Sequence, residues 1–154
     1  MTMAACGVQQ WPRQLRSAGN ATNTGGALSI TLDSTADQMA WVGKSPVTDS
    51  LTTIYFRTET DTTGATVDVR IETVTNGRPT GALFGANTNI GVAIADGDDN
   101  VWKTATLTAA ASLATGDEFA IVINSSAGTP NLDLLTTPLT FDMGGCGQYP
   151  IRLI

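Results

Sequence analysis

The chain has 154 residues, of which 42% are hydrophobic, so it is long enough to form one domain with a substantial core. Its net charge of −6 argues against nucleic-acid binding, which depends on clustered lysines and arginines that neutralise phosphates. The sequence contains no histidine, which removes the Ser-His-Asp triad and nearly all catalytic zinc sites. We therefore expect a binding or structural module and no enzyme.

The N-terminal segment, residues 1–26, is unlike the rest of the chain. Residues 9–16 show neither strand alternation nor a helical stripe, and residues 17–26 are small and polar, as in a linker. Such an arm is commonly ordered only by a partner. The alternative is a terminus that packs on its own domain. We predict an arm that docks on another protein through Trp11, Arg13, Leu15 and Arg16.

Residues 27–154 read as a succession of short strands. Runs rich in Val, Ile and Thr alternate with turns rich in Gly, Asn, Asp and Pro, a spacing typical of antiparallel sandwiches and barrels. We predict an all-β fold, an antiparallel β-sandwich of the jelly-roll type. The expected strands are residues 28–32, 39–43, 51–59, 65–75, 82–84, 90–94, 100–108, 118–124, 131–135 and 139–142.

Three segments give more specific predictions. Residues 119–123 are apolar on both faces and predict a central strand, whereas residues 108–113 are the best candidate for a short helix. Asn76-Gly77 is a strong turn signal, because both residues tolerate a positive φ. Residues 65–75 alternate apolar with charged side chains, which predicts a buried face of Val67, Val69 and Ile71 and a solvated face of Asp68, Arg70 and Glu72.

The apolar C-terminal residues 148–154 have two interpretations. Either the protein continues into a further domain, or these residues form a closing strand that pairs with the sheet or with a neighbour. Sheet edges promote pairing unless they are covered. We therefore expect a homo-oligomer, with a trimer as the first hypothesis, or edge pairing with a neighbour.

The sequence shows neither a membrane-spanning apolar stretch nor the apolar run of a secretion signal, so we expect no membrane insertion. Cys6 and Cys146 are too few for a disulfide framework, and neither has the spacing of a metal site. The pair leaves two states open, a single disulfide and two free thiols.

The turn at residues 96–100 is the candidate metal site. Asp96, Asp98 and Asn100 carry the oxygens that Ca²⁺ prefers and match the first three ligand positions of an EF-hand loop. The match fails at the sixth and twelfth positions, which are Val101 and Leu107. A looser calcium site and a plain acidic turn both remain as interpretations, and no other cofactor is expected.

Aromatic residues and carboxylates are the remaining candidates. Trp41 and Tyr55 lie inside apolar runs and are expected in the core, whereas Trp102 follows the acidic turn and could stack on a sugar ring. A glycosidase needs two carboxylates across a cleft. The carboxylates that could serve in this way are equally compatible with an ordinary solvated strand face. They are Asp68, Glu72, Asp117 and Glu118.

The chain resembles a jelly-roll module found in virion proteins of tailed bacteriophages, in tail-associated and fibre-like chains. The resemblance covers residues 28–135 and contains no active-site signature. Carbohydrate-binding modules share this architecture. The residues that carry the resemblance are Met39–Gly43, Ile54–Thr58, Asp68–Val74, Gly77–Leu83 and Gly116–Ile123.

This resemblance implies a structural subunit of a virion, made in the host cytoplasm without a signal and anchored to other virion proteins through its arm. It also implies reduced cysteines. Two alternatives stay open. One is a carbohydrate-binding module that contacts host surface glycans or belongs to a secreted enzyme, and the other is a capsid decoration protein.

Overall fold

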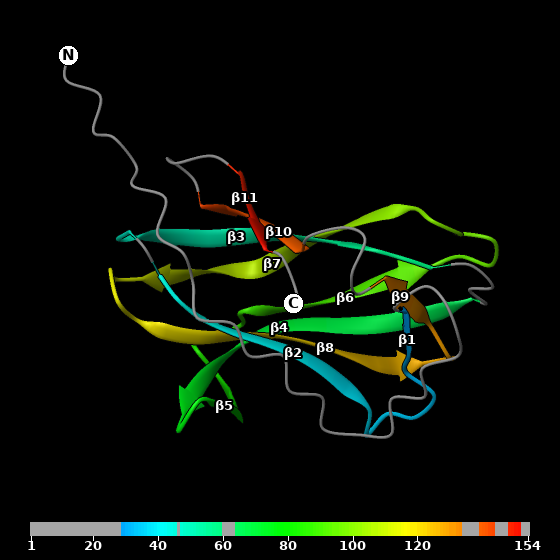
Figure 1. Cartoon of the computed structure of the whole chain (residues 1–154), viewed down its shortest axis with the longest axis horizontal. Coiled ribbons are helices and arrows are strands. Elements are labelled where there is room, and N and C mark those ends of the chain that lie inside the picture. The colour runs from blue at the N-terminus through cyan, green and yellow to red at the C-terminus, as the bar shows by residue number, and fades with distance from the viewer. Residues whose placement is uncertain (1–28, 46, 60–63, 134–138, 144–147, 152–154) are drawn as a thin grey trace, which may run out of the picture.

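The computed structural model describes residues 29–45, 47–59, 64–133, 139–143 and 148–151. These residues form strands and contain no helix, which confirms the predicted all-β class. The strands labelled in Figure 1 are β1 (Ser29–Thr31), β2 (Gln38–Lys44), β3 (Asp49–Arg57), β4 (Ala65–Thr75), β5 (Arg78–Leu83), β6 (Asn89–Ile94), β7 (Trp102–Leu113), β8 (Glu118–Ala127), β9 (Asn131–Asp133), β10 (Leu139–Met143) and β11 (Gln148–Ile151). The predicted anchor residues and both cysteines lie outside the described ranges: Trp11, Arg13, Leu15, Arg16, Cys6 and Cys146.

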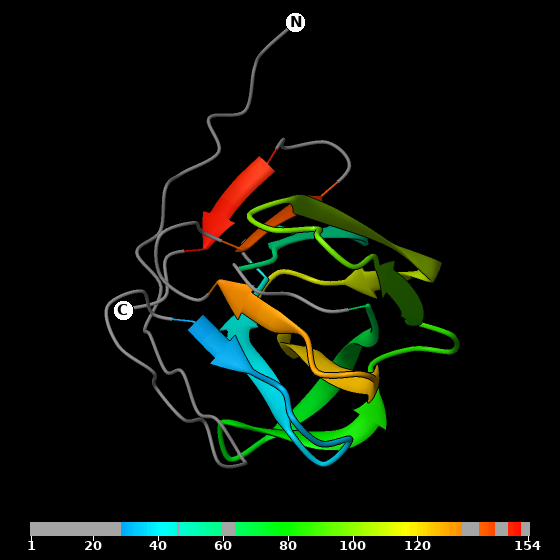
Figure 2. The same ribbon diagram turned by 90° about the vertical axis from the view of Figure 1, so that its right-hand side faces the viewer.

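The strands form two main layers, which Figure 2 shows one above the other. The five-stranded layer contains β2, β8 and β4 in this order, together with β6 and β5. Both of the last two pair with β4: β6 lies along its first half and β5 along its second half. The four-stranded layer has the order β11-β10-β3-β7, and β1 and β9 form a separate pair. All pairings between these strands are antiparallel. The arrangement is that of a β-sandwich-like protein.

Side chains of both layers meet in one buried cluster between them. Burial of apolar surface is the main stabilising term in folding, and here strand alternation supplies it from each layer. β8 is the centre of its sheet, as predicted, because it pairs with both β2 and β4. The largest fully buried side chains are Phe56, Phe119, Leu32, Leu51, Ile54, Ile71, Leu113, Ile121, Ile123 and Leu132.

Trp41 packs against the main core, as predicted. Its ring meets that of Phe119 edge to face, with centroids 5.5 Å apart. The ring also lies over Gly43, two residues along β2. A methyl group at Gly43 would come within 2.2 Å of the Trp41 ring, so the absence of a side chain there allows this packing.

The predicted helix at residues 108–113 is wrong. These residues belong to β7, where Ala111 and Leu113 are buried and pair with β3. Alanine favours helices, but burying alternate residues against a neighbouring strand outweighs that local preference. The C-terminal prediction of a closing strand agrees with β11, which pairs with β10.

The predicted turn at Asn76-Gly77 is confirmed, with φ values of +52° and +70°. It reverses the chain between β4 and β5. β5 pairs with the end of β4 and also contacts β8 and β2, so it curls over the outer face of the five-stranded layer. In Figure 1 it projects below that layer.

The outer face of β4 is not uniformly solvated, so the sequence prediction is wrong for Glu72, which is only 1% exposed. One of its carboxylate oxygens accepts a hydrogen bond from the backbone N–H of Gly81 in β5 at 2.7 Å. The other accepts from Nε of Arg70 at 2.6 Å. Arg70 also donates to Asn124 and to Gln38, so one guanidinium ties three strands together.

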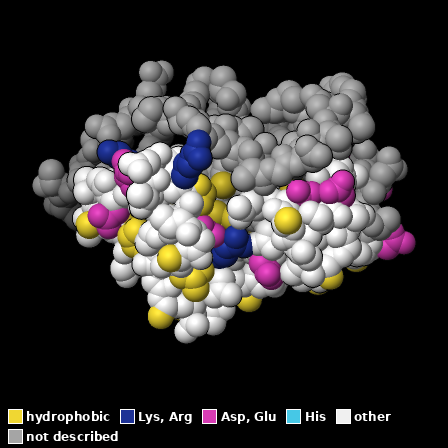
Figure 3. Space-filling view, turned by 90° about the horizontal axis from the view of Figure 1, so that it is seen from below, with side chains coloured by type: hydrophobic (Ala, Val, Ile, Leu, Met, Phe, Trp, Pro, Cys, Tyr) yellow, Lys and Arg dark blue, Asp and Glu magenta, His cyan; other side chains and the backbone are white. Residues whose placement is uncertain are grey.

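The outer face of the five-stranded layer also carries a small apolar cluster beside this network. Ala40, Ala120 and Val122 are buried there, with Val42 and Val74 packed against them. Figure 3 views this side of the molecule and shows mainly neutral atoms, with charged side chains at separate points. The five-stranded layer is therefore partly covered on both of its faces.

Candidate functional site

The most exposed large apolar side chain in the described residues is Trp102, at 45%. It begins β7, where Ala105 and Leu107 are buried, so alternation directs Trp102 to the outer face of the four-stranded layer. Arg57 of β3 is its cross-strand partner, and Tyr55 lies on the same face two residues along. We call Tyr55, Arg57 and Trp102 the Trp102 face.

The Trp102 face shows that the predicted core position of Tyr55 is wrong. Ile54 and Phe56 are buried on β3, so the alternate residue Tyr55 points outward and is only partly buried. An apolar run of three residues cannot reveal which of them faces the core. Trp102, the aromatic residue for which the sequence pattern least favours burial, is exposed.

Arg57 is held in place by the turn that precedes β7. Its Nε donates to the backbone carbonyl of Asn100 and its Nη2 donates to Oδ1 of the same residue, both at 3.2 Å. Asn100 has a φ of +57°, a conformation that asparagine tolerates better than most residues. The guanidinium is therefore positioned beside Trp102 by two bonds from one residue.

The turn itself is anchored by a buried threonine. Thr58 is fully buried, its hydroxyl donates to the carbonyl of Asp98, and the same oxygen accepts from the N–H of Val101 at 3.0 Å. The Thr58 N–H donates to the Val101 carbonyl, also at 3.0 Å. These bonds fix the turn before Trp102, so the Trp102 face is built on a rigid support.

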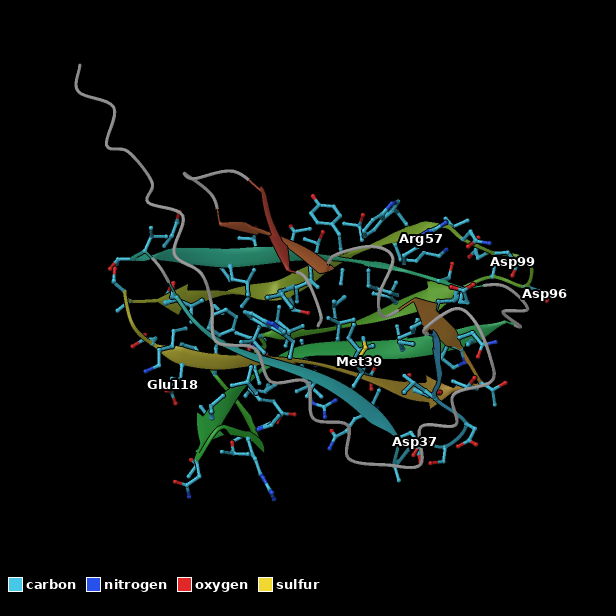
Figure 4. All side chains as sticks on the ribbon, viewed as in Figure 1. Asp37, Met39, Arg57, Asp96, Asp99 and Glu118 are labelled. Carbon is cyan, nitrogen blue, oxygen red and sulfur yellow. The ribbon has the colours of Figure 1, made fainter. Side chains whose placement is uncertain are left out.

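The candidate calcium ligands have other contacts. The carboxylate of Asp98 accepts hydrogen bonds from the backbone N–H of Ala95 at 2.6 Å and from Lys103. Asn100 binds Arg57, as described above, and Asp96 is exposed. Two cationic side chains thus contact the oxygens proposed for calcium. Figure 4 shows Asp96, Asp99 and Arg57 at the same end of the molecule.

The Asp98–Lys103 contact predicts a pH dependence of stability. The hydrogen bond from Lys103, then that from Ala95, lowers the pKa of Asp98 below its ordinary value of 3.8. The stabilisation is therefore complete above that value and is lost as the pH falls through the lower pKa of the folded state. We expect Asp98→Asn to destabilise the protein at neutral pH and to lose this part of the acid sensitivity.

Urea unfolding across the acid range measures this effect. The difference in unfolding free energy between the wild-type protein and Asp98→Asn should shrink as the pH falls. Lys103→Met should behave in the same way, because it removes the other half of the pair. A difference that stays constant with pH would contradict the assignment.

Three of the four carboxylates considered for glycoside hydrolysis have structural contacts. Glu72 bonds Arg70 and the backbone of β5. Asp117 accepts from the N–H of Ala114 at 2.8 Å, and Glu118 pairs with Lys44 at 3.0 Å. Asp68 lies on the outer face of β4 and is partly buried.

Comparison with protein-family models and with curated proteins finds no match. Within the described ranges, no three His, Cys, Asp or Glu side chains lie close enough together to hold a metal ion. The same part of the chain has no helix that is long and apolar enough to cross a membrane.

Proposed function

We propose that the chain is a structural subunit of a tailed-bacteriophage virion, a jelly-roll module in a tail-associated or fibre-like appendage. The proposal rests on the resemblance described in the sequence analysis. The structural observation that supports it is the nested pairing of strands. β2 pairs with β8, β3 with β7 and β4 with β6.

Nested pairs of this kind arise when one long antiparallel ribbon is rolled up, which is how a jelly roll is built. β4 also pairs with β8, because rolling up the ribbon brings these two strands side by side in one layer. β5 lies at the tip of the ribbon, between β4 and β6, and pairs with β4. β10 and β11 extend the four-stranded layer beyond β3.

Such a subunit would present a rigid surface, and its arm would attach it to other virion proteins. Thr58 and Asn100 support the Trp102 face, as described above. We assign this face to contacts with another virion protein or with the host surface. The arm of residues 1–26 is assigned to attachment.

Deletion of residues 1–26 is expected to leave a folded domain that no longer enters particles. The described sandwich carries the buried core, whereas the arm carries the predicted anchor residues Trp11, Arg13, Leu15 and Arg16. Mass spectrometry of purified particles measures incorporation, and unfolding in urea checks the fold. The matched control is Leu83→Ala, a change of one exposed side chain in β5, which should enter particles normally. Normal incorporation of the deletion variant would contradict the anchoring role.

A second function, binding of a carbohydrate, is favoured by one observation. Trp102 presents 45% of its surface on an outer sheet face, next to a guanidinium. An exposed indole offers an apolar face to the C–H groups of a sugar ring, and Arg57 can donate hydrogen bonds to its hydroxyl groups.

Trp102→Ala should weaken binding to a polysaccharide by about tenfold or more, because truncating a central aromatic contact costs about 1.4 kcal/mol or more. The fold should survive the change, since 45% of the residue is exposed and it is not among the buried core residues. Affinity electrophoresis in gels that contain the polysaccharide measures the binding. Leu83→Ala is the control, because Leu83 is also an exposed apolar residue but lies on β5. Equal binding by both variants would remove the sugar contact at Trp102.

A further inference from the structure

The turn between β4 and β5 contains Asn76-Gly77, which neither proposed function uses. Both residues are exposed, and their φ values of +52° and +70° are typical of the tight hairpin turns in which Asn-Gly is preferred. Thr75 pairs with Arg78 across the turn. In Figure 1 this hairpin projects from the five-stranded layer. The turn is therefore open to solvent.

The amide group of Asn76 and the backbone nitrogen of Gly77 are both accessible. The Asn76 side chain has no hydrogen-bond partner among the described residues. Nothing lies within 4 Å of the position that a methyl group would take on Gly77. The backbone nitrogen that follows an asparagine can attack the carbonyl carbon of its side chain. Glycine favours this attack, because no side chain blocks the approach or restricts the rotation of the backbone.

Two other asparagines share the positive φ of Asn76 but have different neighbours. Asn100 is followed by the β-branched Val101, and its side chain is hydrogen-bonded to β3. Asn87 is followed by Thr88, which is β-branched and fully buried. A branched Cβ is stiff and crowds the backbone nitrogen of its own residue. Asn76 is thus distinguished by the residue that follows it and not by its own conformation.

We propose that Asn76 is a site of spontaneous deamidation in the folded protein. The backbone nitrogen of Gly77 attacks Cγ of Asn76 and forms an N–Cγ bond. The Cγ–Nδ2 bond breaks, and Nδ2 leaves as ammonia with the proton of the Gly77 N–H. Water then opens the cyclic imide at one of its two carbonyls. Opening at the side-chain carbonyl gives aspartate, and opening at the backbone carbonyl gives isoaspartate, in which the main chain runs through Cγ.

The reaction requires the turn to open locally, because a tight hairpin turn holds Asn76 and Gly77 in left-handed conformations. Opening at an exposed hairpin tip leaves the buried core intact, so it occurs in the folded protein. The nucleophile is the deprotonated backbone nitrogen. The rate of deamidation therefore rises with pH.

The isoaspartate product disturbs the contact of β5 with its sheet. It adds a carbon atom to the main chain, so the turn no longer fits the pairing of Thr75 with Arg78. Beyond the turn, the N–H of Gly81 in β5 donates to the buried carboxylate of Glu72 at 2.7 Å. Deamidation at Asn76 thereby loosens the strand that covers a buried ion pair.

Incubation of the folded full chain at mildly alkaline pH, followed by peptide mapping with mass spectrometry, tests the site. We expect Asn76 to convert to aspartate and isoaspartate, which chromatography separates, while Asn87 and Asn100 keep their amides. The conversion should be faster at higher pH. A sample unfolded in urea sets the time of incubation, because Asn76 reacts there without the constraint of the turn.

Asn76→Gly is the matched control, because this turn tolerates glycine at both central positions and the variant has no amide to lose at this position. The purified isoaspartate form should unfold at a lower urea concentration than fresh wild-type protein, whereas incubated Asn76→Gly should show no such shift. Asn76→Asp carries the new charge without the extra main-chain atom. It should therefore unfold at a higher urea concentration than the isoaspartate form.

Two results would overturn the deamidation site. One is an Asn76 that keeps its amide in the folded chain when the unfolded sample has converted, and the other is conversion of Asn87 or Asn100 as fast as Asn76. An isoaspartate form as stable as fresh protein would overturn the effect on β5. The test uses the isolated chain, so its outcome is independent of the proposed virion function.

Discussion

Gly128→Ala is expected to lower the free energy of unfolding by about 3 kcal/mol, because backbone strain and a steric clash add at this position. Gly128 follows β8 with a φ of +76°, which residues with a side chain rarely adopt. A methyl group there would lie 2.6 Å from the carbonyl oxygen of Gly64 and 2.9 Å from Cα of Ala65. Both are backbone atoms, of the residue before β4 and of its first residue, so relief requires the two chain segments to separate.

Gly116→Ala is the matched control for this prediction. Gly116 has a φ of +92°, but nothing lies within 4 Å of the position of a methyl group. Strain alone should therefore cost about 1 kcal/mol. Urea unfolding followed by tryptophan fluorescence measures both variants, and an unchanged m-value shows that the two are comparable. Equal losses would mean that the close approach of Gly128 to β4 does not exist in solution.

Glu72→Ala is expected to lower the free energy of unfolding by about 3 kcal/mol, because it removes one partner of a buried ion pair. Arg70 would keep its bonds to Asn124 and Gln38 but would lose its counter-charge. The N–H of Gly81 would lose its acceptor, which would loosen β5 on the outer face of the sheet. Glu72→Gln keeps the shape of the side chain and should give an intermediate loss.

Glu118→Ala provides the exposed counterpart of this change. Glu118 pairs with Lys44 at 3.0 Å, but 46% and 58% of the two side chains are exposed. Solvent screens such a pair, so its loss should cost about 0.5 kcal/mol. If chemical denaturation gave similar values for Glu72→Ala and Glu118→Ala, the burial of Glu72 under β5 would be wrong.

The parts of the fold that local periodicity determines could be predicted from the sequence. The alternation in β4 correctly placed Val67, Val69 and Ile71 in the core. The apolar run in β8 correctly indicated a central strand, because only a strand buried on both faces tolerates such a run. Each of these features depends on residues within one strand.

The features that sequence reasoning missed depend on contacts between distant segments. Glu72 is buried because β5 curls over it, and β7 continues through a helix-favouring run because β3 lies beside it. The alternation of β4 alone contains no information about β5. The alanines of β7 likewise give no sign of the strand with which they pair.

At the candidate site, the sequence could single out Trp102, but it could not predict the hydrogen bonds that hold the neighbouring residues in place. Trp102 follows an acidic turn and does not lie inside an apolar run, so burial is least favoured for it among the aromatic residues considered, and it is exposed. The core position predicted for Tyr55 is wrong because a short apolar run does not determine which of its residues faces the core. The two bonds between Asn100 and Arg57 join residues 43 positions apart, so no local pattern could indicate them.

The most direct test of the central proposal is immuno-gold electron microscopy of purified phage particles with an antibody against the sandwich domain. The proposal predicts label on the tail or its fibres. Label over the head would instead assign the chain to capsid decoration, which contradicts the appendage role but keeps the virion. No label on any particle would contradict the virion proposal and would leave carbohydrate binding at Trp102 as the function that the exposed face supports.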